Sequence, residues 1–143
     1  MTVSERLFAS LRRESDFLCV LATVGTDGRP HVRYMKGMID DHLVIRCPTF
    51  TSTQKVRDIR RLSAVSLTCG DTDASQPGSY FQIDGHATIS QEHGDRIVAW
   101  TPRLEKWFSG PEDGNYAVVK IVPDSIVAMP IGGGPAAEVW TAG

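Results

Sequence analysis

The sequence predicts a mainly β fold, an antiparallel barrel of about six or seven strands with a few helices. Short runs rich in β-branched and aromatic residues alternate with turn-forming residues along the chain. Most neighbouring runs are only a few residues apart, which suits antiparallel pairing through hairpins. At 143 residues the chain is long enough to bury a core. We expect one domain over residues 1–130 and a flexible C-terminal tail over residues 131–143.

The chain should begin with a helix and continue into a meander of three strands. Thr2 and Glu5 have the spacing of a capping box, and apolar residues recur at helical spacing as far as Leu11, which predicts a first helix of about ten residues. An Asp-Gly turn joins the first two strands, and the next turn is at Asp40 and Asp41. The three strands are expected at Phe17–Val24, Pro30–Met38 and His42–Cys47.

The second half of the chain should add helices and the remaining strands. An amphipathic pattern predicts a helix at Val56–Leu62, and a second helical pattern at Gly94–Phe108 is broken by Pro102. Asp84 and Gly85 fall inside a strand and predict a bulge, because glycine within a strand often marks one. The remaining strands are expected at Ala64–Cys69, Ser79–Ser90 and Tyr116–Val122, the last closed by Pro123, with Ser125–Met129 as an extension of the sheet.

The most informative segment, Thr49–Lys55, joins the third strand to the amphipathic helix and is rich in hydroxyl residues. Helix starts expose unpaired backbone N–H groups and the positive end of the helix dipole, so they bind anions. Lys55 and Arg57 add full positive charges, and Arg46 precedes the segment. Two interpretations are open, because the hydroxyls could form an ordinary N-cap or help to bind a phosphate. No Walker or GxGxxG motif accompanies the segment, so a standard nucleotide-binding fold is not indicated.

The composition describes an ordinary soluble globule, with 41% hydrophobic and 22% charged residues and a net charge of −2. It gives no electrostatic reason to expect binding to nucleic acid or to an anionic membrane. The longest apolar run, Phe17–Ala22, is too short to span a bilayer, and the N-terminus has no signal-like apolar region, so a cytoplasmic location is expected. The three cysteines should be buried free thiols, and the scattered histidines predict no metal site.

Four parts of the chain resemble the FMN-binding split-barrel family, the pyridoxamine 5'-phosphate oxidase-like proteins, and within it the general stress protein branch. They are the hairpin Phe17–Val32, the turn Thr49–Lys55, the strand segment Asp84–Ala87 and the region Trp100–Val122. The resemblance implies a split β-barrel that binds FMN non-covalently at the interface of a homodimer. It implies two-electron redox chemistry on a small cytoplasmic substrate, with a nicotinamide or other reductant. A deazaflavin-dependent reductase and a non-catalytic flavin-binding or flavin-sequestering stress protein are the alternatives.

The same resemblance implies roles for residues of the second strand and of the region after Pro102. Arg33 and Met35 match the strand that lies along the flavin, where the arginine reaches the FMN phosphate. The alternative for Arg33 is a solvated residue on a polar strand face, and Lys36, in the opposite strand phase, should point away from the flavin. Trp107 matches aromatic residues that lie near the flavin or the partner subunit, with ordinary packing as its alternative.

In the turn, the resemblance implies that Thr49 lies near the flavin ring and that Thr53 and Lys55 bind the phosphate. Gln54 stands where the oxidase subgroup has an arginine, so one phosphate contact lacks its charge. The C-terminal arginine motif that holds the pyridoxal substrate of the oxidase has no match in Ile131–Gly143. We therefore expect an FMN-dependent oxidoreductase that is not a true pyridoxamine phosphate oxidase.

Overall fold

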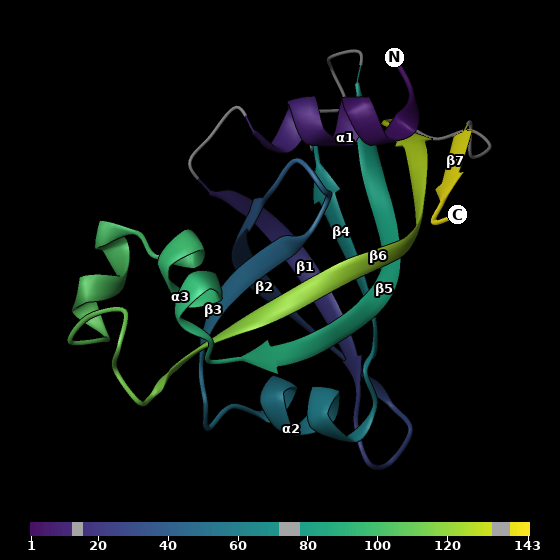
Figure 1. The fold of residues 1–143 in the computed structure, drawn as a ribbon. Helices are drawn as coiled ribbons and strands as arrows, with labels where there is room; N and C mark the ends of the chain where they lie inside the picture. The colour runs from purple at the N-terminus through teal and green to yellow at the C-terminus, as the bar shows by residue number, and fades with distance from the viewer. Residues whose placement is uncertain (13–15, 72–77, 133–137) are drawn as a thin grey trace.

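The computed structural model describes residues 1–12, 16–71, 78–132 and 138–143. Its strands form one antiparallel sheet in the order β3-β2-β1-β4-β5-β6-β7, and an additional β3–β6 pairing closes six of them into a barrel (Figure 1). This confirms the predicted fold class. The strands are β1 (Phe17–Val24), β2 (Pro30–Ile39), β3 (Ile45–Phe50), β4 (Ala64–Gly70), β5 (Ser79–Ser90), β6 (Tyr116–Pro130) and β7 (Glu138–Thr141). The helices are α1 (Val3–Leu11), α2 (Gln54–Arg61), α3 (His93–Ala99) and the 3-10 helix η1 (Pro102–Lys106).

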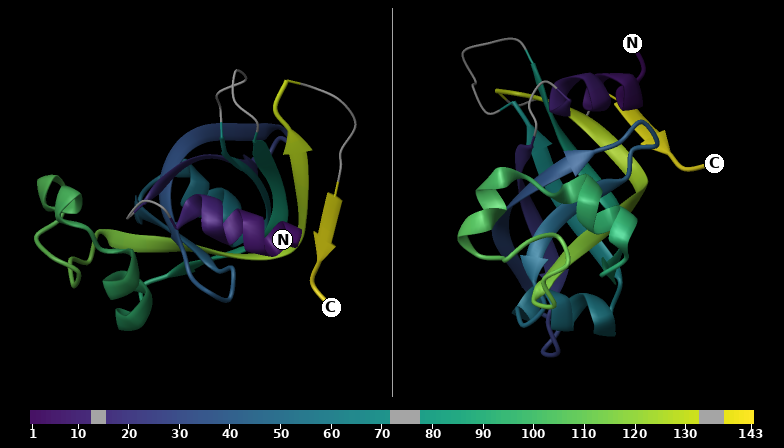
Figure 2. Two further views of the ribbon diagram at one scale, coloured as in Figure 1. Left: turned by 90° about the horizontal axis from the view of Figure 1, so that it is seen from above. Right: turned by 60° about the vertical axis from the view of Figure 1, so that its left-hand side comes forward.

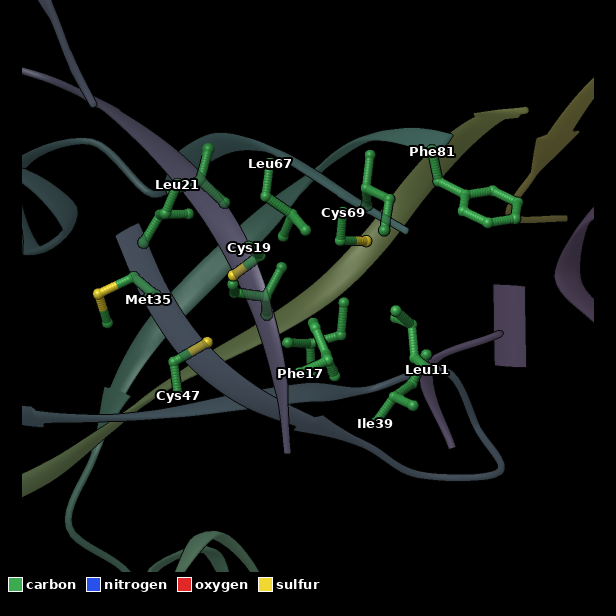
Figure 3. Close-up of a cluster of buried hydrophobic side chains, with 14 of the residues drawn as sticks. Leu11, Phe17, Cys19, Leu21, Met35, Ile39, Cys47, Leu67, Cys69 and Phe81 are labelled. Atoms are coloured by element: carbon green, nitrogen blue, oxygen red, sulfur yellow. The ribbon is translucent and has the colours of Figure 1, made fainter. Parts of the chain in front are cut away.

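The core fills the inside of the barrel, because alternate side chains of each strand point inward. Cys19, Cys47 and Cys69 are free and buried there, as predicted, and they lie among aliphatic and aromatic side chains (Figure 3). A hydrogen bond with Cys19 and burial raise the pKa of the Cys47 thiol. Burial also raises the pKa of Cys69. All three cysteines are therefore core residues, and the raised pKa values make Cys47 and Cys69 poor nucleophiles.

A helix covers each end of the barrel (Figures 1 and 2). Helix α1 begins with the predicted capping box of Thr2 and Glu5, and its buried side chains join the barrel core. Helix α2 covers the opposite end and buries Val56 and Ile59, while its arginines face outward. It begins at Gln54, two residues before the predicted start. The N-terminus of α2 therefore lies directly after the hydroxyl-rich turn.

The prediction for β3 is wrong at both ends, because the strand runs from Ile45 to Phe50 and not over His42–Cys47. Asp40 forms a turn in which its side chain accepts hydrogen bonds from the backbone N–H groups of His42 and Val44. Leu43 adopts a left-handed φ of 67° in this turn, a conformation that a leucine does not signal in a sequence. The strand consequently starts later and extends into the hydroxyl-rich turn.

The prediction that Pro123 closes a strand is also wrong, because β6 continues without a break to Pro130. The register between β5 and β6 shifts at Asp84 and Gly85, where the predicted bulge is found, and Pro123 lies opposite Gly85. A proline can sit at a bulge because the ladder is already interrupted there and its missing N–H leaves no partner unpaired. The helical region before β6 is divided near Pro102, as predicted, into α3 and η1.

The C-terminal region contains a strand that the sequence analysis did not predict. Residues 138–141 form β7, which pairs with β6, and Arg6 of α1 makes a 2.9 Å ion pair with Glu138. These four residues of the C-terminal region therefore extend the sheet beyond β6. Gly133 and Gly134, which belong to the predicted flexible tail, lie outside the described residues.

We predict that Gly85→Ala destabilises the protein by about 1–3 kcal/mol, because the new methyl group would meet packed backbone at the bulge. A Cβ at this position would lie 2.5 Å from the carbonyl oxygen of Val122. Urea denaturation measures the change in free energy of unfolding. The matched control is Gly94→Ala in α3, where a Cβ has open space and alanine should stabilise by about 0.5–1 kcal/mol. Equal effects of the two substitutions would contradict the conclusion that packed backbone at the bulge excludes a side chain at Gly85.

Candidate functional site

The candidate site lies where β2 and β3 separate. The two strands pair at only two positions, Met38 with Arg46 and Ile39 with Ile45. Beyond these positions β3 remains paired with β6, so β2 and β3 diverge and leave an opening in the barrel wall. A pocket of about 300 Å³ occupies this opening. Four of the residues selected from the sequence line it together, namely Met35, Thr49, Lys55 and Trp107.

Lys55 and Thr49 form the buried wall of the pocket. The Nζ atom of Lys55 donates to Oγ1 of Thr49 at 3.0 Å, and Thr49 is only 6% exposed. Oγ1 of Thr49 lies 3.4 Å from Oγ1 of Thr53, so the three side chains form a continuous polar row. Burial lowers the pKa of Lys55, and the positive charge of nearby Arg33 lowers it further. An anion bound here would relieve the repulsion between these two cations.

The N-terminus of α2 adds backbone donors to this wall. Thr53 is the N-cap residue, but its side chain makes no capping hydrogen bond and instead lies 3.2 Å from the carbonyl oxygen of Phe50, to which it donates. The interpretation of the turn as an ordinary hydroxyl N-cap is therefore not realised at Thr53. The first turn of α2 keeps N–H groups for another acceptor, which is the arrangement that binds oxyanions.

Arg33 lies behind this wall and is not solvated on a polar face. It has the same strand phase as Met35, and it is half-buried. Its Nη1 atom donates to Oγ1 of Thr23 at 2.8 Å and to the carbonyl oxygens of His31 at 2.9 Å and Leu21 at 3.2 Å. Burial lowers the pKa of Arg33, although the charge of Asp58 acts in the opposite direction. Arg33, which is predicted to bind the phosphate, thus has its guanidinium held inside the barrel, close to Lys55.

Asp58 is a central residue that the sequence analysis missed. This aspartate of α2 is 5% exposed and accepts a 2.8 Å hydrogen bond from Oγ1 of Thr23, the hydroxyl that also accepts from Arg33. Nδ1 of His31 lies 3.4 Å from the Asp58 carboxylate and 3.2 Å from Nε2 of Gln54. Burial opposes ionisation of Asp58, but the hydrogen bonds from Thr23 and His31 and the nearby positive charge lower its pKa. Asp58 was the only acid in a basic segment, which is the signal that could have identified it.

Aromatic side chains form the outer wall of the pocket. Phe50 and Phe108 pack with ring centroids 4.7 Å apart, and Phe108 packs in turn on Tyr116 at 5.0 Å. Trp107 is 51% exposed and lines the pocket. Phe108, by contrast, is buried against its own chain.

Two basic residues, Lys36 and Arg46, have different surroundings from those expected, and a third lines the pocket without having been predicted. Lys36 is exposed and out of phase with Met35, as predicted, yet it lines the same pocket because the pocket passes around the edge of β2. Arg46 does not reach the turn, since it pairs with Asp40 at 2.8 Å and with Asp95 at 2.7 Å. Arg103, which the sequence did not single out, also lines the pocket.

Within the described residues, side chains of the metal-ligand type gather in the β2–β3 turn. One group of side chains, Asp40, Asp41 and His42, brings three ligand-type atoms close together, and it lies in the β2–β3 turn away from the pocket. Asp40 is already paired with Arg46. Among the described residues no helix is long and apolar enough to cross a membrane.

Comparisons with known proteins agree with this architecture. Residues 9–129 match the family model described as pyridoxamine 5'-phosphate oxidase. General stress protein 26 of Bacillus subtilis (strain 168) is 36% identical over 112 residues, which are 78% of this chain and 79% of the relative. The crystal structure of General Stress Protein 26 from Bacillus anthracis str. Sterne superposes with a TM-score of 0.80 at 26% identity, covering 99% of this chain and 100% of that chain. A putative pyridoxamine 5'-phosphate oxidase from Listeria innocua gives a TM-score of 0.72 at 27% identity, covering 88% and 97%.

We predict that Asp58→Asn lowers the free energy of unfolding by about 1–3 kcal/mol at neutral pH, because the acceptor of a buried charge-assisted network loses its negative charge. The lowered pKa of Asp58 means that its stabilisation is present above the ordinary aspartate pKa and is lost as the pH falls through the folded-state value. The difference from wild type should therefore shrink below about pH 4. Denaturant titrations between pH 7 and pH 3 measure it.

The control for this prediction is Asp41→Asn, which changes an aspartate whose side chain is 81% exposed. It should alter the free energy of unfolding by less than about 0.5 kcal/mol at any of these pH values. A difference between Asp58→Asn and wild type that stays constant down to pH 3 would contradict the role assigned to the ionised carboxylate.

Proposed function

The chain belongs to the pyridoxamine 5'-phosphate oxidase family, and on this premise we propose that it is a flavoprotein that binds FMN non-covalently in the pocket between β2 and β3. One observation carries the proposal. Lys55 lines the buried side of a pocket with aromatic walls. It lies in the first turn of a helix whose N-cap side chain does not cap it, and a second cation, Arg33, is close to it.

The buried wall supports the assignment of the phosphate. A phosphate needs charge-assisted donors, which an ammonium, a guanidinium and free helix N–H groups provide together. Lys55 is held by Thr49, and Arg33 uses only Nη1 in its described hydrogen bonds, so Nε and Nη2 remain for a ligand. Thr53 can add a hydroxyl. Gln54 is exposed in the first turn of α2 and offers a neutral amide in place of a charge.

The remaining walls support the assignment of the ring. A planar tricyclic ring is held best between apolar and aromatic surfaces with a few polar groups at its edge. Met35, Phe50 and Trp107 supply such surfaces, and Thr49 supplies a hydroxyl next to them. When bound, the flavin would supply two-electron redox chemistry, while these residues bind and orient it and exclude water.

We propose an oxidoreductase acting on a small cytoplasmic substrate, with a nicotinamide or other reductant, and stress-related in its role. The stress-related role rests on the 36% identical relative that is named a general stress protein. A non-catalytic flavin-binding or flavin-sequestering protein is the second candidate. It is favoured by the pocket lining, which contains no aspartate, glutamate or histidine among the described residues that could transfer a proton.

Spectra and anaerobic reduction distinguish these functions. A yellow protein with flavin absorption bands supports FMN, whereas a different chromophore spectrum supports the deazaflavin alternative. Reoxidation of the reduced flavin by added acceptors at catalytic rates supports the enzyme. A bound flavin that is neither reduced by nicotinamide cofactors nor reoxidised by acceptors supports the binding protein.

A homodimer completes the proposal. Leu18, Val32 and Tyr34 are 50%, 67% and 74% exposed on the outer face of β1 and β2. A second, largely apolar pocket of about 450 Å³ adjoins this face and shares Leu18 and Tyr34 with the candidate site. Contiguous apolar patches of this kind mark interfaces, and twofold pairing is the commonest solution. A partner on this face would lie against the mouth of the flavin pocket.

We predict that Lys55→Ala weakens FMN binding roughly ten- to a hundredfold, because it removes a charge-assisted bond worth about 1.5–3 kcal/mol. Riboflavin, which lacks the phosphate, should bind almost unchanged. Fluorescence titrations with the two ligands measure the difference. Arg57→Ala is the matched control, because Arg57 is exposed on the same helix and donates to the carbonyl oxygen of Ser52. Equal losses for FMN and riboflavin would refute the phosphate assignment.

We also predict that Trp107→Ala weakens both dimer assembly and flavin retention, because its exposed ring lies between the pocket and solvent. Added FMN should tighten the wild-type dimer by mass action and raise its melting temperature. Sedimentation and retained flavin absorbance at low micromolar protein measure both effects. Val139→Ala, an exposed apolar residue on β7, is the control that should change neither. A monomer that holds FMN stoichiometrically would contradict the prediction.

A further inference from the structure

The flavin pocket has a second positively charged region. Of its described lining residues, three are cations, Lys36, Lys55 and Arg103, and none is an anion. Lys55 belongs to the buried wall, beside Thr49. The side chains of Lys36 and Arg103 are 43% and 38% exposed, so they lie at the mouth. The two regions are held by different elements, α2 on the buried side and β2 with η1 on the open side.

The cations at the mouth share one carboxylate. Asp16, which directly precedes β1, lies with Oδ2 3.0 Å from Nη2 of Arg103 and with Oδ1 4.0 Å from Nζ of Lys36. Its side chain is 18% exposed, so these two pairs are partly shielded from water. One negative charge facing two positive charges leaves the mouth with a net positive charge. A guanidinium has five N–H donors and an ammonium has three, so one carboxylate does not use them all.

We propose that Lys36 and Arg103 bind the carboxylate of the small molecule that exchanges electrons with the flavin, and that Asp16 is the internal anion with which this carboxylate competes. The inference rests on the proposed flavin function. We infer a carboxylate ligand because a carboxylate already lies between the two cations. One oxygen of Asp16 faces Lys36 and the other faces Arg103. Arginine binds carboxylates through a matching fork of parallel donors.

The flavin phosphate would not occupy this region. Lys55 and Arg33 repel one another on the buried side, where α2 adds N–H donors, and that side has no counterpart of Asp16 on its pocket wall among the described residues. The mouth cations are already half-neutralised by a carboxylate that a ligand can share or displace. The pocket therefore has one strong anion site for the cofactor and one weaker, exchangeable anion site for the substrate.

Benzoate and its neutral analogue benzamide are the probes, because they differ in charge and little in shape. Calorimetric titration of FMN-loaded protein should show that benzoate binds about tenfold more tightly than benzamide, as expected for charge-assisted bonds. Arg103→Ala and Lys36→Ala should remove this preference and change FMN affinity by less than about twofold. Lys106→Ala is the matched control, because Lys106 is a neighbouring cation of η1 that lies 5.9 Å from the Trp107 ring and does not line the pocket.

Asp16→Asn gives the sharpest result. If Asp16 competes with the ligand, removing its charge should tighten benzoate binding about threefold or more and leave benzamide unchanged. If Asp16 only supports the fold, the substitution would weaken both probes or neither, and the inference would be wrong. Equal binding of benzoate and benzamide to wild type, or a preference that survives Lys36→Ala combined with Arg103→Ala, would also overturn it. Tighter binding of phenyl phosphate than of benzoate would overturn the assignment of a carboxylate.

The same series separates this inference from the proposed cofactor. If the purified protein does not bind FMN but still binds benzoate more tightly than benzamide, the flavin assignment is refuted and the anion site remains. An Arg103→Ala variant that loses FMN affinity but keeps riboflavin affinity would show the cofactor phosphate at the mouth. That result would refute the substrate site and leave a flavoprotein.

Discussion

Because β3 pairs with β6 along its whole length and with β2 at only two positions, the barrel opens where β2 and β3 diverge. A fully closed barrel of this size has an interior filled by its own side chains, with no room for a planar ligand. Here the interior is filled as well, by the core around Cys19 and Leu21. The opening in the wall therefore provides a pocket that the filled inside of the barrel does not. The first turn of helix α2 lies at the buried side of the pocket in this opening, where Lys55 lines it.

Three cations near the opening differ in how far carboxylates compensate their positive charge. Arg46 forms ion pairs with Asp40 and Asp95. Burial lowers the pKa of Arg46, but the two carboxylates raise it by more, so the pKa is raised overall. Arg33 has an indirect counter-charge, because Asp58 reaches it through the hydroxyl of Thr23. In its described contacts Lys55 faces the hydroxyl of Thr49 and a neighbouring cation, with no carboxylate among them, and burial and the charge of Arg33 lower its pKa. Of these three cations Lys55 has the least compensation, and unlike Arg33 and Arg46 it lines the pocket, which is the arrangement expected where an anionic ligand supplies the missing charge.

The sequence was sufficient where local chemistry decides the structure. The capping box of α1, the hairpin between β1 and β2 and the bulge at Gly85 depend on residues close together in the chain, and all are found. The sequence was insufficient where the local structure depends on contacts between residues far apart in the chain. Strand β6 passes Pro123 because the distant strand β5 carries a compensating bulge, which the residues next to Pro123 do not show. The late start of β3 has a local cause that the residue types did not signal, because a leucine, Leu43, adopts the left-handed conformation in the turn that Asp40 organises.

The candidate site shows a further limit of reasoning from strand phase. Alternation assigns side chains to two faces, and it places Met35 inside and Lys36 outside correctly. Two faces are separated, however, only where a strand has a neighbour on each side. At the opening β2 has no partner on the side of β3, so side chains of both phases reach one pocket around its edge. A site built at a gap in a barrel therefore collects residues from both phases. This is why the inward-facing Met35 of β2 lies toward Thr49 and Lys55, the proposed phosphate side, while the outward-facing Tyr34 and Lys36 line the mouth of the pocket.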